Sequence, residues 1–177
     1  MPVALRSPRS TALLSIAAAV ITIVLKTLAW KLTGSVGLLS DAIESGVNLV
    51  AAIGAFWALS LAAKPADRTH HYGHFKAEYF SSGLESVLIV VAALAILHEA
   101  IGRLHQPEPL EQLGLGLVIS VLATVLNAVV AVVLLRAAKR FDSITLRADA
   151  QHLLTDVWTS SGVVVGIGLV KLTGLTI

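Results

Sequence analysis

DAIESGVN at residues 41–48 is echoed later in the chain by DAQHLLTD at residues 149–156, and both strings lie within apolar stretches. In each string the polar side chains are separated by three, four and seven residues. At about 100° of helical turn per residue, such positions fall within an arc of roughly 60°, so each polar trio shares one face of a helix. Two such faces are suited to enclosing one ion between them.

The composition identifies the surroundings of these strings as a membrane. Hydrophobic residues make up 56% of the 177 residues and charged residues only 14%, and the mean hydropathy of +0.84 is too high for a soluble domain of this size. An ionisable side chain near the centre of a bilayer costs about 2.5–3.5 kcal/mol to insert, and it normally faces a bundle interior or a wet cavity. The polar trios therefore predict a functional site.

Apolar segments long enough to cross a bilayer predict an all-α, polytopic transmembrane helix bundle with five spans. An N-terminal segment at residues 1–10 precedes the transmembrane domain at residues 11–177. The spans are expected at about residues 11–33, 36–63, 79–104, 113–138 and 144–172. The short connection between the first two spans predicts that these two are antiparallel neighbours.

The distribution of cations predicts the orientation. Lysines and arginines gather before the first span and in the loops after the second and fourth spans: Arg6, Arg9, Lys64, Arg68, Lys76, Arg136, Lys139, Arg140 and Arg147. The positive-inside rule then places the N-terminus and the loop at residues 64–78 in the cytoplasm, and we expect a bacterial cytoplasmic (inner) membrane. The net charge of +2 reflects these loops, and nothing indicates nucleic-acid binding.

The loop PADRTHHYGHFKAE at residues 65–78 holds a second cluster of metal-ligating residue types. Asp67, His70 and His74 offer a carboxylate and two imidazoles at near-helical intervals, which suits a borderline metal such as zinc. The alternative is a solvated loop whose histidines bind nothing. Cysteine is absent from the chain, which excludes thiolate ligands and disulfides.

Together, the second-span string, the loop string and RADAQHLLTD at residues 147–156 resemble the cation diffusion facilitator family of divalent-metal transporters. The resemblance covers essentially the whole chain. It implies export of zinc or a related divalent ion in exchange for protons. It also implies a homodimer, six helices and a cytoplasmic C-terminal domain, whereas the sequence shows five spans and no such domain.

The resemblance assigns residues as well. It implies a tetrahedral transport site formed by side chains of the second and fifth helices, at Glu44, Asn48, His152 and Asp156. It implies a further metal site, present in some members, at Asp67, His70 and His74. A truncated membrane protein that binds metal or regulates a partner without transporting is the alternative function.

The second-helix ligands depart from the family's familiar zinc sites, which have Asp or His followed four residues later by Asp. Glu44 and Asn48 shift the ligand set toward oxygen, which favours iron, manganese or cobalt, although family membership favours zinc. Asn48 has no titratable proton, so we expect the maximum number of protons exchanged per metal ion to be lower than in a site whose ligands all titrate. The transported divalent cation is a substrate, and no cofactor is expected.

Other buried polar residues are given supporting roles. We expect Asp41 and Asp149 to line the ion path or to support the ligands, in preference to direct ligation. Glu85 is expected to pair with a cation such as Lys26 or Lys31, and Asn127 to form an interhelical hydrogen bond. The chain has no His-Glu-x-x-His motif or nucleophile elbow, so we do not expect an enzyme.

Overall fold

A computed structural model describes residues 7–33, 36–105 and 113–173. These residues form five long helices: α1 (Pro8–Thr33), α2 (Val36–Ala62), α3 (Lys76–His105), α4 (Leu113–Phe141) and α5 (Ile144–Thr173). The predicted all-α class is confirmed, and each helix begins and ends within three residues of a predicted span. Residues 1–6 of the predicted N-terminal segment, Arg6 included, lie outside the described residues.

Capping residues explain where the helices begin and end. The Ser7 hydroxyl accepts a hydrogen bond from the Ser10 backbone N–H at 3.1 Å, and Pro8 occupies the first helical position, where its missing N–H costs nothing. Helix α2 ends at Ala62, three residues before Pro65. A proline has no backbone N–H to donate, so the helix could not continue through this position without losing a hydrogen bond. At the start of α5, Ser143 caps the Leu146 N–H at 3.3 Å.

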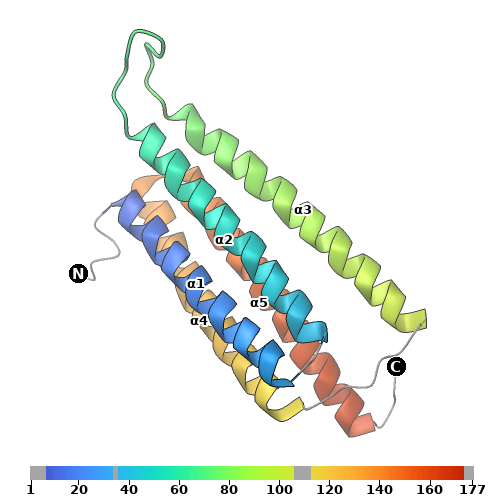
Figure 1. Cartoon of the computed structure of the whole chain (residues 1–177). Helices are drawn as coiled ribbons and strands as arrows, with labels where there is room; N and C mark the ends of the chain where they lie inside the picture. The colour runs from blue at the N-terminus through green and yellow to red at the C-terminus, as the bar shows by residue number, and fades with distance from the viewer. Residues whose placement is uncertain (1–6, 34–35, 106–112, 174–177) are drawn as a thin grey trace.

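The helices are arranged as a four-helix bundle with α3 along one side (Figure 1). Within the bundle, α1 packs on α2 and α4, and α5 packs on α4 and α2. Helix α3 packs on α2 and α5, and many of its large apolar side chains, such as Phe80 and Leu94, are exposed. The two strings of the repeated pattern therefore lie on helices that contact each other inside the molecule.

The bundle interior is built from small apolar side chains. Its core contains mainly alanines and leucines: Ala12, Ala18, Leu59, Val130, Ala131, Leu134, Ala137, Ala138, Leu146, Ala150 and Leu153. Small residues let helix backbones approach closely, which is how helices associate inside a bilayer, where burial of apolar surface gives little gain.

Helices α1 to α4 each contain a stretch long and apolar enough to cross a membrane. The described part of α5 carries Arg147, Asp149 and Asp156, which lower its hydropathy. Its apolar second half begins after these residues, in the sequence VVVGIGLV at residues 163–170. The helix with the densest set of polar residues is thus the one that contributes half of the repeated pattern.

Three hydrogen bonds join neighbouring helices at the end of the bundle where α1 begins. The Arg9 guanidinium donates a hydrogen bond to the Ser60 carbonyl at 3.1 Å, which joins the start of α1 to the end of α2. Glu78, in the first turn of α3, accepts a hydrogen bond from the Ser143 hydroxyl at 2.5 Å and one from the Thr145 N–H at 3.4 Å. The loop between α2 and α3 is therefore anchored next to the start of α5.

Candidate functional site

Three carboxylates meet between α2 and α5. Asp41, Glu44 and Asp156 each place one oxygen within 4.8 Å of the others, close enough to share a metal ion. Asp156 is buried, whereas Asp41 and Glu44 are partly exposed. Asp41 lies in this group even though its spacing suggested a path or supporting role. That Asp41 lines the ion path or supports the ligands, in preference to binding the ion directly, stays a prediction.

His152 and Asn48 form the next layer of the same interface. The His152 Nε2 atom lies 2.5 Å from the Asn48 Oδ1 atom, and both side chains are buried. Their other polar atoms, His152 Nδ1 and Asn48 Nδ2, have no hydrogen-bond partner among the described residues. The four residues predicted for the transport site thus lie on two facing helix surfaces, with Glu44 and Asp156 beside the histidine and asparagine pair.

A lysine from a third helix reaches into the carboxylate group. The Lys26 ammonium lies 2.8 Å from Asp41 Oδ1 and 3.5 Å from Asp156 Oδ1, and the Lys26 side chain is only 1% exposed. The expected pairing of Glu85 with Lys26 is therefore wrong, because two carboxylates of the α2–α5 interface are closer. Lys31, the other candidate partner of Glu85, is exposed.

A fourth helix, α4, contributes Asn127 to the same site. Its amide donates a short hydrogen bond to Asp156 Oδ2, and its carbonyl oxygen lies 3.3 Å from the Thr22 hydroxyl of α1. The predicted interhelical hydrogen bond of Asn127 is confirmed. Both oxygens of Asp156 are consequently occupied, one by Lys26 and one by Asn127.

Two more carboxylates are buried outside this group. Asp149 and Glu85 are both 1% exposed, and one oxygen of each has no hydrogen-bond partner in the described part of the chain. Glu85 contacts its own helix, where the Ser81 hydroxyl donates to it at 3.5 Å. Asp149 is not among the groups of described residues that place ligand atoms within reach of one ion, so the two aspartates of the repeated pattern, Asp41 and Asp149, have different surroundings.

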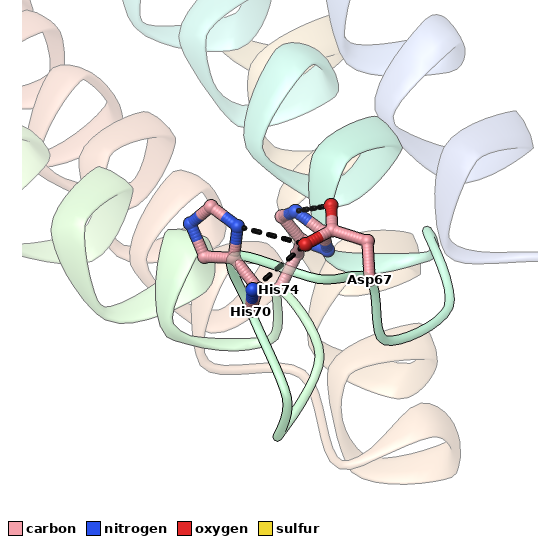
Figure 2. A group of neighbouring side chains, drawn as sticks. All are labelled: Asp67, His70 and His74. Carbon is pink, nitrogen blue, oxygen red and sulfur yellow. Dashed lines mark hydrogen bonds and ion pairs between the residues drawn. The ribbon is translucent and has the colours of Figure 1, made fainter.

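The loop between α2 and α3 gathers the second predicted set. Asp67, His70 and His74 place one ligand atom each within 4.8 Å of one another, and Figure 2 shows the Asp67 carboxylate facing both imidazoles. Asp67 Oδ1 lies 3.4 Å from His70 Nδ1, and Asp67 Oδ2 lies 3.3 Å from His74 Nε2. Half of the Asp67 side chain is exposed, whereas Asp156 of the bundle group is only 2% exposed.

Local hydrogen bonds hold this loop in shape. Asp67 Oδ1 accepts hydrogen bonds from the Thr69 hydroxyl, the His70 N–H and the Thr69 N–H, at 2.9, 2.7 and 2.9 Å. These donors stabilise the carboxylate, so they hold the pKa of Asp67 well below its usual range. Gly73 has a φ of 81°, which glycine adopts without strain, and its N–H closes the turn onto the His70 carbonyl at 3.0 Å.

The family model described as the cation efflux transmembrane domain matches residues 12–177. The chain belongs to the cation diffusion facilitator family. An uncharacterized transporter of Synechocystis is 60% identical over 169 residues, which cover 96% of this chain and 54% of that protein. The cation-efflux pump FieF of Shewanella oneidensis is 34% identical, covering 88% of this chain and 52% of the pump.

The FieF pump of Klebsiella pneumoniae is 31% identical over 83% of this chain and 49% of the pump. The chain thus spans about half the length of these relatives. Membership of this transporter family agrees with the four helices that, within the residues the structure describes, are long and apolar enough to cross a membrane.

Proposed function

We propose that this chain forms the membrane part of a divalent-cation efflux transporter. Glu44, Asn48, His152 and Asp156 form its transport site. The observation that supports this most strongly is the juxtaposition of the two polar helix faces, with His152 Nε2 2.5 Å from Asn48 Oδ1 and with Glu44 and Asp156 in one ligand group. Buried ionisable groups of this kind are costly inside a membrane unless they serve an ion path.

The proposed ligands set the class of substrate. Two carboxylate oxygens, one amide oxygen and one imidazole nitrogen suit divalent first-row metals, and family membership favours Zn²⁺. The oxygen-rich set also accepts Fe²⁺, Mn²⁺ or Co²⁺, which prefer harder ligands than zinc does. If Asp41 joins the site, the share of oxygen ligands rises further.

Metal binding and proton binding compete for the same atoms, which supports exchange of metal for protons. Carboxylate and imidazole groups bind a metal only after they lose their protons, so loading the site releases protons and protonation favours metal release. Asn48 does not titrate and contributes no proton to this exchange. The proposed antiport therefore depends on Glu44, His152 and Asp156.

Other parts of the proposal concern the surroundings of the site. We place the chain in a bacterial cytoplasmic membrane with the N-terminus inside, because the start of α1 and the ends of α2 and α4 lie at the same end of the bundle (Figure 1). Arg9, Lys64 and Arg140 are at or next to these helix ends in the sequence, and the positive-inside rule assigns such an end to the cytoplasm. Asp67, His70 and His74 form a second, exposed metal site at that end. The working assembly is a homodimer, as the family resemblance implies.

Flux measurements on the purified chain in vesicles test the transport proposal. We expect Zn²⁺ or Mn²⁺ uptake, read by an internal metal-sensitive dye, to be lost in His152→Ala and Asp156→Asn and retained in Glu85→Gln. Glu85 is the matched control, because it is also a buried carboxylate but lies outside the ligand group. Metal binding without flux would support a non-transporting metal-binding protein instead.

The same vesicles test the exchange of protons. An internal pH dye gives the ratio of protons to metal ions, and we expect Asn48→Asp to raise that ratio because it adds a titratable group to the site. An unchanged ratio with intact flux would show that position 48 does not limit proton coupling.

A further inference from the structure

Lys26 brings a positive charge into a site that is proposed to hold a positive ion. Its ammonium is nearly inaccessible to solvent and contacts carboxylates from two helices, α2 through Asp41 and α5 through Asp156. Glu44 also lies close enough to interact electrostatically with it. A charge buried in a membrane is stable only when it is paired, and these carboxylates provide the pairing.

The formal charges of the cluster are unequal. Asp41, Glu44 and Asp156 carry three negative charges when ionised, and Lys26 carries one positive charge, which leaves two negative charges. A divalent cation that enters this cluster therefore balances it. Without Lys26, the three carboxylates would repel one another within 4.8 Å in the unloaded site.

The two contacts of Lys26 differ in length. The ammonium is 2.8 Å from Asp41, a distance typical of a strong charge-assisted hydrogen bond, and 3.5 Å from Asp156. The other oxygen of Asp156 already accepts the hydrogen bond of Asn127. A metal ion that binds Asp156 must replace one of these two contacts. The contact of Oδ1 with Lys26 is the longer one, so we expect the ion to replace it more easily than the hydrogen bond of Oδ2 with Asn127.

We propose that Lys26 is a tethered counter-cation of the unloaded transport site, and that an incoming divalent ion must displace its ammonium from Asp156 while Asp41 retains it. This inference rests on the proposed function of the site. It makes Lys26 a residue that sets metal affinity without being a ligand. The apparent affinity for metal is lower than the intrinsic affinity by the fraction of time in which the site is free of the ammonium.

A purely structural ion pair leads to a different expectation. If Lys26 only held α1, α2 and α5 together, removing its charge would loosen the site and weaken metal binding or leave it unchanged. If Lys26 competes with the metal, removing its charge strengthens binding even when the fold becomes less stable. Metal affinity and thermal stability, measured on the same samples, therefore separate the two roles.

Calorimetric titration of the purified full chain with Zn²⁺ and with Mn²⁺ provides the test. All samples carry His70→Ala and His74→Ala, so that the loop contributes no heat of binding. The charge is removed in Lys26→Gln, which keeps a hydrogen-bond donor, and in Lys26→Met. The charge is kept in Lys26→Arg. Lys31→Gln is the matched control, because Lys31 lies on the same helix but is exposed.

We expect Lys26→Gln and Lys26→Met to lower the Kd for metal by about tenfold. If the ammonium leaves the site free for only about a tenth of the time, the apparent Kd is about ten times the intrinsic Kd, and the neutral variants remove this factor. Lys26→Arg should stay within about threefold of the parent because the charge is kept, and Lys31→Gln should not change the Kd. If one neutral variant does not fold, the other decides, and Lys26→Arg must still bind like the parent.

Asp156→Asn separates this inference from the proposal on which it rests. Loss of binding in Asp156→Asn, together with unchanged or weaker binding in the neutral Lys26 variants, would overturn the role of Lys26 and leave the transport site in place. Parent-like binding in Asp156→Asn would overturn both, because the metal would then bind elsewhere.

Discussion

The bundle and the α2–α3 loop each gather three ligating side chains within 4.8 Å, but they do so by different physical means. In the bundle, Asp41, Glu44 and Asp156 are brought together by helix packing, and a lysine from α1 offsets part of their charge. In the loop, Asp67 is half exposed and is held by hydrogen bonds from Thr69 and His70, its near neighbours in sequence. Asp67 and His70 are 50% and 55% exposed, so solvent reaches this cluster.

This contrast shows what burial adds to a cluster of acidic residues. A buried carboxylate must be paired at all times, so its partners become part of the fold, and removing one of them is costly. An exposed carboxylate can exchange its partners for water at little cost. We therefore expect the bundle cluster to contribute to the stability of the fold and the loop cluster to change with little effect elsewhere.

The largest expected effect comes from removing a carboxylate of the bundle. Asp156→Leu leaves the Lys26 ammonium with a single carboxylate contact and the Asn127 amide without its acceptor. We expect the free energy of unfolding to fall by about 3–5 kcal/mol, as for other buried ion pairs that lose one partner. Thermal or denaturant unfolding in detergent, followed by tryptophan fluorescence, measures this loss.

Asp67→Leu is the comparison in the loop, and it should change the unfolding transition far less because solvent replaces the lost contacts. Equal destabilisation by the two substitutions would break the distinction between the regions. The double substitution Asp156→Leu with Lys26→Met should recover part of the stability, since it also removes the charge that Asp156→Leu leaves behind.

A smaller effect is expected at the contact that joins the two regions. Glu78 accepts hydrogen bonds from Ser143 and Thr145 and so fastens the end of the loop to the start of α5. A hydrogen bond to a charged group contributes about 1.5–3 kcal/mol, and glutamine keeps one neutral acceptor oxygen, so we expect Glu78→Gln to lower the free energy of unfolding by about 1–2 kcal/mol. Combining it with Ser143→Ala in a double-mutant cycle should show less than additive loss. Additive losses would mean that the contact is not formed in the membrane.

The smallest effect concerns the pH dependence of the loop. Hydrogen bonds lower the pKa of Asp67 in the folded loop, so their contribution is complete above the unfolded pKa of about 3.9 and is lost only as the pH falls through the lower, folded value. Hydrogen-exchange protection of the Thr69 and His70 amides should therefore stay constant from pH 7 to about pH 4. Asp67→Asn should lower this protection at every pH. Loss of protection in the parent near pH 5 would contradict the assigned hydrogen bonds.

The helices were predictable because their signals are local. The length of the apolar segments predicted five spans, and each helix begins and ends within three residues of one of them. The meeting of α2 and α5 was predictable only through the repeated spacing and the family resemblance. The loop cluster was predictable because Asp67, His70 and His74 are near one another in sequence, so local turns suffice to bring them together.

The role of Lys26 was not predictable from the sequence. The two partners of Lys26 lie 15 and 130 residues away in the sequence. The spacing of residues within α1 does not reveal which side chains of the neighbouring helices Lys26 contacts. From the sequence, Glu85 was as good a candidate partner for Lys26 as Asp41 or Asp156. Only the packing of the helices shows that Lys26 contacts the two aspartates. Two lysines within the first apolar span, Lys26 and Lys31, were the available signal, and they indicated only that some carboxylate must be near.

The separation of these partners along the chain has a consequence for biogenesis. Proteins are synthesised from the N-terminus, so α1 and α2 are available to the membrane before α5 has been made. The Lys26–Asp41 contact closes within this first hairpin, which lets the pair enter the bilayer with its ammonium already neutralised. Asp156 arrives last and meets a lysine that already has a partner, so the order of synthesis matches the unequal lengths of the two contacts.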